Sequence, residues 1–534
     1  MKKLLCLLLC LLMAMTAFSA VSAEPAQEII YALANEPDGI DPGVTNNSFA
    51  SPILNNVFEG LVAYSTEDGA LIPAEAESWT ISDDGLTYTF TLRDGLKWSD
   101  GSDHTAQDYV YAMKRILDPN TEAKYVDFLL SYVVGAAEYY ADNSIGFDTV
   151  GVKAPDDKTF VFTLIAPTPY WIDILAMWTF SPVQEATIAA NGERWTASAD
   201  AYVTNGPFRV AEINMGESYV LEKNPYYYDA DQVKLDKITF RFISDLGTSL
   251  MAYESGDING MNSIPTTDMA RLKAEDAGVV MTPSYGTVWY DFNCAKAPFD
   301  NVLVRKAFCL AVDRLAIIED VVQTEADPAY SFMSPGYVVN GEDLLATASD
   351  NGLSEEADVE AAQAALAEAG YPNGEGFPEI TLSYYSSETV GKVVEAMARQ
   401  LQDALNIKIK ISNADWAVYY ADILAGNYDI GAMGWSGDYL HPMTFLALFV
   451  TDDANNNVFY SNPEYDALVA QAANMTDAEE AFQVMRQAEA LAAAEYPVLP
   501  LYYKANTMLM HKNVAGYFVT PSNDLLLKTA YVTD

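Results

Sequence analysis

The feature that most constrains the fold is the stretch LTYTFTL at residues 86–92, in which an apolar side chain occupies every second position. Alternation with period 2 predicts a β-strand with one buried face, because successive side chains of a strand point to opposite sides of a sheet. Asp-Gly pairs at 84–85 and 94–95 bracket the stretch, and such pairs are typical of tight turns. The sequence therefore predicts antiparallel hairpins in this region.

Further regular elements follow along the chain. The stretches KTFVFTL (158–164), FRVAEI (208–213) and SYVLEK (218–223) are short and rich in β-branched and aromatic residues, which favours strands. The stretch RKAFCLAVD (305–313) is expected to be a helix that follows a turn.

Two alanine-rich runs carry helix boundary signals. The run at 359–369 follows Asp358, a capping residue, and stops at Gly370. The other follows Thr476 with Glu479 three residues on, the spacing of a capping box. Helices and strands mixed throughout a long chain predict an α/β protein with several lobes.

The N-terminus has the pattern of a secretory signal peptide at residues 1–23. Lys2 and Lys3 precede an apolar run at 4–18, and small residues end the segment. We expect the mature chain to begin at Glu24 and to be exported across the cytoplasmic membrane.

Membrane attachment is not expected after export. Cys6 and Cys10 lie inside the apolar run, and neither follows the small residues that precede a lipidated cysteine, so we expect no lipid anchor at Cys10. No later segment contains the roughly 18 consecutive apolar residues of a membrane span.

Charge and length narrow the class of protein. The net charge of -46 becomes -48 once Lys2 and Lys3 are removed, which argues against nucleic acid or anionic lipid as a partner. A mature chain of about 510 residues is expected to form roughly two to four domains. Cys294 and Cys309 are the cysteines that remain, and the sequence leaves open whether they pair.

No catalytic motif is present in the sequence. His104, His441 and His511 are far apart, and there is no HExxH, P-loop or G-x-G-x-x-G pattern. Gly434 to Asp438 fails the G-x-S-x-G pattern because its last position is Asp. With 75 carboxylates, a hydrolytic acid pair stays open as an alternative.

A candidate binding site lies in the stretch GWSGDYLHP at 434–442. The strand-like run before it is interrupted by small residues, and glycine in a strand allows another backbone or a ligand to approach closely. An extended guest could add itself there as a strand. Asp438 would then receive a cationic group such as an α-ammonium, with Trp435 and Tyr439 excluding water. The alternative is that Asp438 opens a turn before Pro442 and that the aromatic residues are ordinary core.

The order of several motifs makes the mature chain resemble a known family, the family 5 extracytoplasmic solute-binding proteins of ABC importers, in particular the oligopeptide- and dipeptide-binding type. The motifs are EPDGIDP (36–42), FEGLV (58–62), PAEAESWTIS (73–82), DGLTYTFTLRDGLKWSDG (84–101), TAQDYVYAMKRILDP (105–119), TNGPFRV (204–210), LEKNPYYYDA (221–230), PFDNVLVRKAFCLAVDR (298–314), AEAGYPNGEGFP (367–378) and GWSGDY (434–439).

The resemblance implies a type II periplasmic-binding-protein-like α/β fold with two lobes, a hinge and an additional third domain. Lobe I would comprise 24–58, 180–285 and 504–534. The additional domain II would comprise 59–179, and lobe III 286–503. The lobes would close over a ligand about the hinge.

The resemblance also implies the site residues. Asp438 would hold the amino terminus of a peptide, and Met433, Gly434, Trp435 and Ser436 would pair with the peptide backbone. Spacing from neighbouring motifs places a second contact to the peptide backbone at Ser48 and Phe49. It also places three aromatic residues in the pocket, namely Tyr125, Tyr285 and Trp416.

The chain departs from the family where arginines would meet the peptide carboxylate. The corresponding positions are Ala432 and approximately Leu424. The carboxyl end could be anchored elsewhere, the peptide length could differ, or the guest could be another cation.

The leading hypothesis is a non-catalytic, monomeric binding protein without a cofactor, which captures short peptides outside the membrane and delivers them to an ABC permease. The same scaffold could instead bind a nickel complex or an oligosaccharide. From other classes, a secreted acid-pair hydrolase and a receptor-docking sensory module stay open.

Overall fold

The computed structural model describes residues 25–47, 49–67, 69–324, 326–339, 341–346, 351–520 and 522–533. The expected signal peptide and Ser48 lie outside the described residues.

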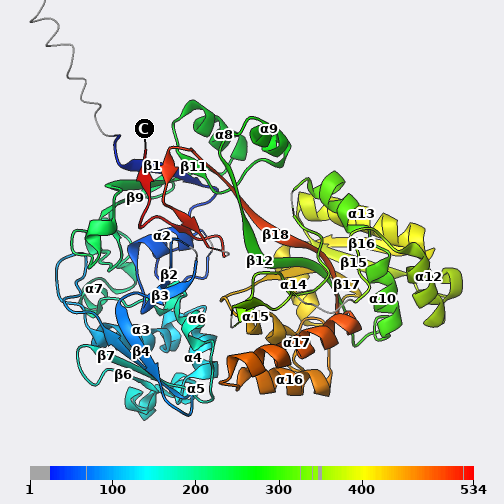
Figure 1. The fold of residues 1–534 in the computed structure, drawn as a ribbon, viewed down its shortest axis with the longest axis horizontal. Helices are drawn as coiled ribbons and strands as arrows, with labels where there is room; N and C mark the ends of the chain where they lie inside the picture. Colours follow the sequence, from blue (N-terminus) through cyan, green and yellow to red (C-terminus); the bar gives the residue numbers. More distant parts are fainter. Residues whose placement is uncertain are drawn as a thin grey trace, which may run out of the picture.

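A ten-stranded mixed sheet connects two halves of the molecule (Figure 1). Two long antiparallel strands, β12 and β18, run from one half into the other (Figure 1). In sheet order the strands are β16 (Ile409–Ala414), β15 (Ile380–Tyr385), β17 (Ile430–Ser436), β12 (Val279–Phe292), β18 (Val498–Met510), β11 (Gly260–Met261), β1 (Glu28–Leu33), β10 (Lys237–Phe242), β9 (Ser218–Lys223) and β8 (Phe208–Asn214).

The pairing of β12 with β18 is interrupted where the halves meet. Pairs run from Val279 opposite Leu509 to Pro283 opposite Ala505, and pairing resumes with Thr287 opposite Tyr503. Residues 284–286 of β12 therefore face a single residue of β18, Lys504. An irregularity of this kind bends the strands and redirects side chains. The predicted lobe boundaries at 285/286 and 503/504 fall at the same place and remain a prediction.

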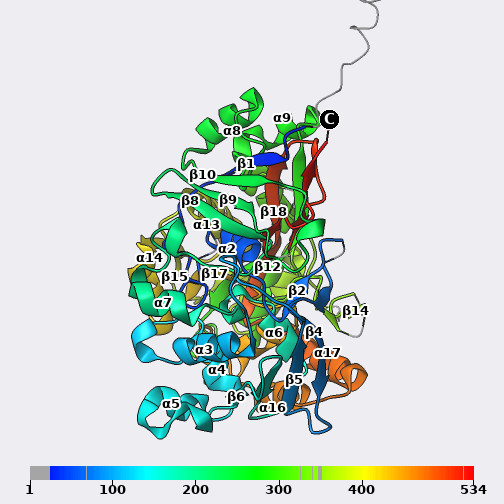
Figure 2. The same ribbon diagram turned by 90° about the vertical axis from the view of Figure 1, so that its left-hand side faces the viewer.

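A four-stranded antiparallel sheet forms a separate unit below β8, β9 and β10 in Figure 2. Its order is β4 (Ala76–Ile81), β5 (Thr87–Leu92), β7 (Thr159–Thr163) and β6 (Val152–Lys153). The predicted alternation is confirmed, because Tyr88, Phe90 and Leu92 are buried while the intervening threonines are more exposed. Helix α3 (Ala106–Ile116) packs on β6 and β7. The predicted strands at 208–213 and 218–223 are also present, as the antiparallel pair β8 and β9.

The predicted helices are present, with one correction. Helix α10 (Val302–Leu310) covers most of 305–313, and Asp358 caps α12 (Val359–Glu368) by accepting the Ala361 N–H at 2.9 Å. The capping box expected at Thr476 is wrong. Asp477 caps α17 (Ala478–Glu495) instead, because its carboxylate accepts two N–H groups of the first turn.

Buried side chains pack in both halves, and one cluster contains residues of both, for example Phe180 and Tyr439. A buried cluster that includes Phe292, Phe308, Met397 and Ile430 joins α10 and α13 to the sheet in the half that contains β15–β17. The other helices are α2 (Ser51–Val57), α4 (Val126–Tyr132), α5 (Ala136–Ala141), α6 (Trp171–Leu175), α7 (Glu185–Asn191), α8 (Leu246–Ser255), α9 (Met269–Ala274), α11 (Arg314–Ala316), α13 (Glu388–Leu405), α14 (Trp416–Leu424), α15 (Met443–Leu446) and α16 (Pro463–Ala473). Short paired strands complete the fold, namely β2 (Val62–Tyr64), β3 (Leu71–Pro73), β13 (Val338–Val339), β14 (Glu342–Asp343), β19 (Val514–Ala515), β20 (Phe518–Val519), β21 (Leu525–Leu526) and β22 (Tyr531–Val532).

The C-terminal tail returns to the N-terminal segment. The Gln27 side-chain amide donates to the Val532 carbonyl at 3.0 Å, and the Asn56 amide donates to the Leu525 carbonyl at 2.7 Å. The two ends of the described chain therefore belong to the same half.

Cys294 and Cys309, whose pairing the sequence left open, are both free thiols. Burial raises the pKa of Cys294 to about 11 and that of Cys309 to about 12. Both thiols are therefore protonated at neutral pH, and the protonated form is the less nucleophilic one.

Candidate ligand-binding site

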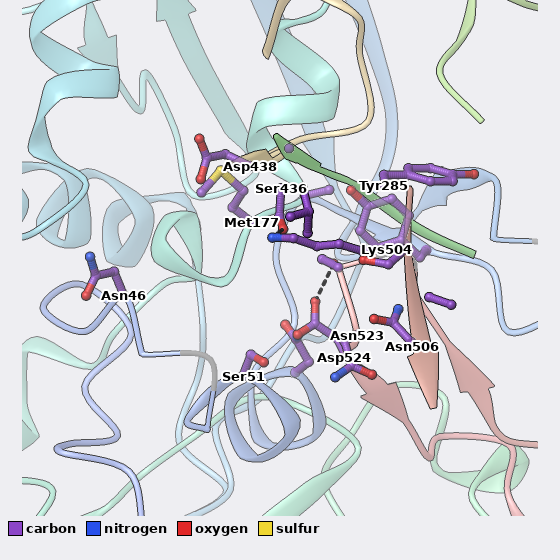
Figure 3. Close-up of a pocket in the computed structure, with 18 of the residues that line it drawn as sticks. Asn46, Ser51, Met177, Tyr285, Ser436, Asp438, Lys504, Asn506, Asn523 and Asp524 are labelled. Carbon is purple, nitrogen blue, oxygen red and sulfur yellow. Dashed lines mark hydrogen bonds between the residues drawn. The ribbon is translucent and has the colours of Figure 1, made fainter. Parts of the chain in front are cut away.

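A cavity of about 550 Å³ lies between the two halves, beside the interruption in the β12–β18 pairing (Figure 3). Its lining comes from distant parts of the chain. It includes Asn46, Ser51 and Asn55 near α2, Tyr125, Met177 and Trp178 from the region of the small sheet, Ser284 and Tyr285 of β12, Ser436 at the end of β17, Gly437 and Asp438 after it, Tyr502, Lys504 and Asn506 of β18, and Ser522, Asn523 and Asp524 of the tail.

Asp438 faces this cavity from the segment that follows β17. Its backbone N–H donates to the Thr444 hydroxyl at 3.1 Å, and the preceding Gly437 N–H donates to the Tyr285 carbonyl at 2.9 Å. In the part of the chain that the structure describes, no hydrogen bond or ion pair engages the Asp438 carboxylate. Burial raises the pKa of this carboxylate to about 6. The side chain is therefore held in a partly desolvated place without a partner of its own.

The turn alternative for Asp438 is not supported by these contacts. A turn-opening Asp accepts a nearby backbone N–H with its side chain, and the described residues contain no such bond to Asp438. The segment is held instead by aromatic contacts with the opposite half. Tyr170 stacks on Tyr439 at 5.7 Å and on His441 at 4.7 Å between ring centroids, and Phe128 meets Tyr439 edge to face at 6.1 Å.

Within the described part of the chain, the strand ahead of Asp438 has one edge that is partly unpaired. β17 pairs with β12 along its whole length, from Ile430 to Ser436. On its other side β15 pairs only with Ile430 and Gly431. The Tyr419 hydroxyl donates to the Ala432 carbonyl at 2.8 Å, so the backbone from residue 433 to 436 is the part left for a guest strand.

The glycines of β17 are required by the protein itself. A Cβ atom at Gly434 would lie 2.6 Å from the Thr287 carbonyl oxygen of β12, and one at Gly431 would lie 2.6 Å from Ile423 Cδ1. The close approach that the sequence predicted at Gly434 is therefore that of a neighbouring backbone, one of the two possibilities left open.

A second cavity of about 190 Å³ adjoins the first and shares Val288, Tyr502 and Lys504 with it. Met433, Gly434 and Trp416 also line it. Trp416 is 51% exposed and stacks on Tyr420 at 5.1 Å. Together the two cavities follow the open edge of β17 from Ala432 to Asp438.

The structure brings most, but not all, of the sequence candidates to these cavities. Asp438, Ser436, Tyr125 and Tyr285 line the first, and Met433, Gly434 and Trp416 line the second. Trp435 lies on another small hollow with Trp289 and Phe449. Phe49 lines neither cavity, and its N–H donates to the Asn47 side chain at 2.8 Å.

Sequence reasoning missed Lys504, Asp524, Asn46, Asn506 and Met177, which also line the first cavity. Lys504 had a detectable signal, since it is a lone cation inside the apolar strand LPLYYKANTMLM of a very acidic chain. The others carry no local pattern, because only the fold places them beside Asp438.

Two absences hold for the described residues alone. None of their helices combines the length and apolarity needed to cross a bilayer. No three or more His, Cys, Asp and Glu side chains among them converge in a way that could hold a metal ion.

The chain belongs to the bacterial extracellular solute-binding proteins, family 5, whose profile matches residues 70–457. It is 35% identical over 509 residues to the oligopeptide-binding protein OppA of Bacillus subtilis, covering 93% of this chain and 91% of that protein.

Solved structures agree with this assignment. The unliganded open form of the murein tripeptide-binding protein MppA has a TM-score of 0.81 at 30% identity, covering 96% of this chain and 98% of that one. Haemophilus influenzae OppA in complex with RPPGFSPFR has a TM-score of 0.76 at 31% identity, covering 96% and 100%. The fold is therefore the type II periplasmic-binding-protein fold.

Proposed function

We propose that this protein captures short peptides outside the cytoplasmic membrane and delivers them to an ABC permease. The observation that carries the proposal is the unpaired Asp438 carboxylate, which faces a cavity between the two halves at the end of an open strand edge. Membership of this family supports a peptide guest, as does similarity to proteins named for binding oligopeptides or a murein tripeptide.

Two kinds of contact bind the peptide, one to its main chain and one to its amino terminus. Backbone groups of residues 433–436 pair with the main chain of the peptide, which gives affinity without reading side chains. Asp438 binds the α-ammonium group, and a charge-assisted hydrogen bond in a closed cleft contributes about 1.5–3 kcal/mol net. Trp416, Tyr125 and Tyr285 line the space for peptide side chains.

Closure occurs about β12 and β18. Two rigid parts move relative to each other. One consists of lobe I (24–58, 180–285 and 504–534) with domain II (59–179), and the other is lobe III (286–503). The interrupted pairing at residues 284–286 is the support for a hinge at this position, since local irregularity absorbs backbone rotation more easily than a continuous ladder.

The protein acts outside the cytoplasmic membrane and performs no catalysis. The signal peptide at 1–23 directs export, no lipid anchor is attached at Cys10, and the mature protein is a monomer. It releases its ligand unaltered, so a peptide recovered after incubation has its original mass.

The decisive test of the site compares peptides with free and N-acetylated amino termini by calorimetric titration. For wild type, acetylation should weaken binding by about tenfold or more, the worth of a charge-assisted hydrogen bond. Asp438→Asn should weaken binding of the free peptide similarly and leave the acetylated peptide unaffected. Asp403→Asn, on the exposed face of α13, is the matched control and should change nothing. Equal affinity of wild type for blocked and free peptides would remove Asp438 from this role.

A further inference from the structure

Three charged side chains among the described residues line the first cavity, namely Asp438, Asp524 and Lys504. Asp524 is engaged, because its carboxylate accepts the Ser522 hydroxyl at 2.8 Å. Within the described residues, Asp438 and Lys504 form no ion pair, either with each other or with another group. The cavity therefore presents one unpaired anion and one unpaired cation.

Lys504 reaches the cavity because of the irregularity in the large sheet. It is the residue of β18 that lies opposite residues 284–286 of β12. Its ammonium group donates to the Ser436 hydroxyl at 2.9 Å, and Figure 3 shows the side chain extended toward Ser436. A bulge that redirects one side chain is a common feature at binding sites.

Gly286 makes room for this lysine. A Cβ atom there would lie 2.8 Å from Lys504 Cδ and 2.8 Å from the Ser436 hydroxyl oxygen. A side chain at this position would therefore force the lysine stem or Ser436 to move. The surrounding chain is shaped to hold the cation against Ser436.

Holding unpaired charges in a partly desolvated cavity is unfavourable unless a ligand compensates them. Burial lowers the pKa of Lys504 and raises that of Asp438, which is the expected sign of this cost for both groups. A guest with a cation at one end and an anion at the other would satisfy both.

We propose that Lys504 binds the carboxylate of a short peptide whose α-ammonium group is bound by Asp438. This inference rests on the proposed function. It also accounts for the missing arginines, because Ala432 and Leu424 supply no cation, and a lysine of β18 supplies one instead.

The short separation along the chain between Asp438 and Ser436, the residue that Lys504 contacts, favours peptides of two or three residues. Lys504 contacts Ser436, and Ser436 is two residues from Asp438, a Cα separation of at most about 7 Å. An extended peptide spans at most about 3.3–3.6 Å per residue. A longer peptide would carry its carboxylate past Lys504.

The test uses equimolar pools of dipeptides, tripeptides and pentapeptides, each synthesised as free acids and as C-terminal amides. Retention by the mature protein is measured by native mass spectrometry, and affinities of retained peptides by titration. Wild type should prefer the free acids of dipeptides and tripeptides over their amides by about tenfold or more, and should make no such distinction for pentapeptides.

Variants assign the preference to Lys504. Lys504→Met keeps the stem and removes the charge, so it should abolish the distinction between acid and amide. Lys504→Arg should retain it. Lys410→Met removes an exposed lysine of β16 that pairs with Glu379 and should behave as wild type. Thermal melting of each variant checks folding, and the wild-type comparison of acid with amide decides the question even if Lys504→Met does not fold.

The outcomes separate this inference from the function on which it rests. Equal binding of acids and amides by wild type would overturn the role of Lys504, and an acid preference that persists in folded Lys504→Met would do the same. In either case a loss of binding on N-acetylation would leave peptide capture intact. Retention of no peptide from any pool would refute both proposals.

Discussion

Asp438 is the residue on which the proposed recognition depends, and its environment makes the charge state sensitive to pH. Burial raises the pKa of Tyr125, Tyr337 and Tyr439, and the negative charge of Asp438 contributes to each of these shifts. His441 is neutral, because burial lowers its pKa to about 3. Asp438 is thus the member of this group that titrates near pH 6.

Peptide affinity should therefore fall as the pH is lowered through 6. The pKa of free Asp438 is about 6, and binding of an ammonium group requires the ionised form, so the pKa in the complex is lower than in the free protein. Loss of the proton then accompanies binding, and affinity should be about tenfold lower at pH 5 than at pH 7. Above about pH 8 the α-ammonium group itself deprotonates.

Titration calorimetry across pH 4.5–8 measures this dependence, with Asp438→Asn as the control that should flatten the acid side of the profile. The stability of the ligand-free protein should depend on pH in the opposite direction from the affinity. Its raised pKa means that the folded state keeps a proton that the unfolded state has released between about pH 4 and 6. This group therefore lowers stability as the pH rises through that window. An affinity that is unchanged between pH 5 and 7 would contradict the assignment.

In the strand β17, a glycine allows close packing against the neighbouring strand β12. Gly434 has a φ of 156° and lies against the β12 backbone. Its substitution therefore tests packing between strands.

Gly434→Ala should destabilise the protein by about 1–3 kcal/mol, the usual cost of overpacking. The added Cβ would collide with the Thr287 carbonyl oxygen at 2.6 Å. The shift in the midpoint of urea unfolding measures the effect. Gly39→Ala is the matched control, because a Cβ there meets no atom within 4 Å. A Gly434→Ala protein as stable as the control would show that β12 and β17 can separate without cost.

Helix α17 provides the second prediction at this scale. The Asp477 carboxylate accepts the N–H groups of Glu479 and Glu480, each at 3.0 Å. Asp477→Ala should therefore cost about 1 kcal/mol of stability, as is typical for loss of an N-cap. Thermal melting compares it with Thr476→Ala, which should be nearly neutral. The reverse ranking would restore the capping box that the sequence suggested at Thr476.

At the scale of the whole molecule, the two halves meet through the long strands β12 and β18 and through the aromatic contacts of Tyr170 with Tyr439 and His441. The cavity between them draws its lining from both halves. A ligand that contacts both halves stabilises the arrangement in which they lie closest.

Addition of a peptide that the protein binds should therefore reduce the radius of gyration measured by small-angle X-ray scattering. The same peptide with an acetylated amino terminus, at the same concentration, should produce a smaller change. A radius that stays constant at saturating free peptide would exclude closure as part of binding.

Much of this protein is determined by its sequence over short distances. Alternating side chains specified β5, a capping carboxylate and a terminal glycine specified α12, and the run before Asp438 indicated the strand β17. These predictions succeeded because strand faces and helix caps depend on residues a few positions apart.

Only the tertiary structure decided which distant residues share the cleft. Lys504 and Ser436 are 68 positions apart and meet across β12, the strand that lies between β17 and β18. The tail residue Asp524 faces the same cavity as Tyr125 and Asp438. The edge of β17 is open because β15 stops pairing at Gly431. No local pattern encodes such meetings, since they result from sheet order and from one interruption in register where the two halves join.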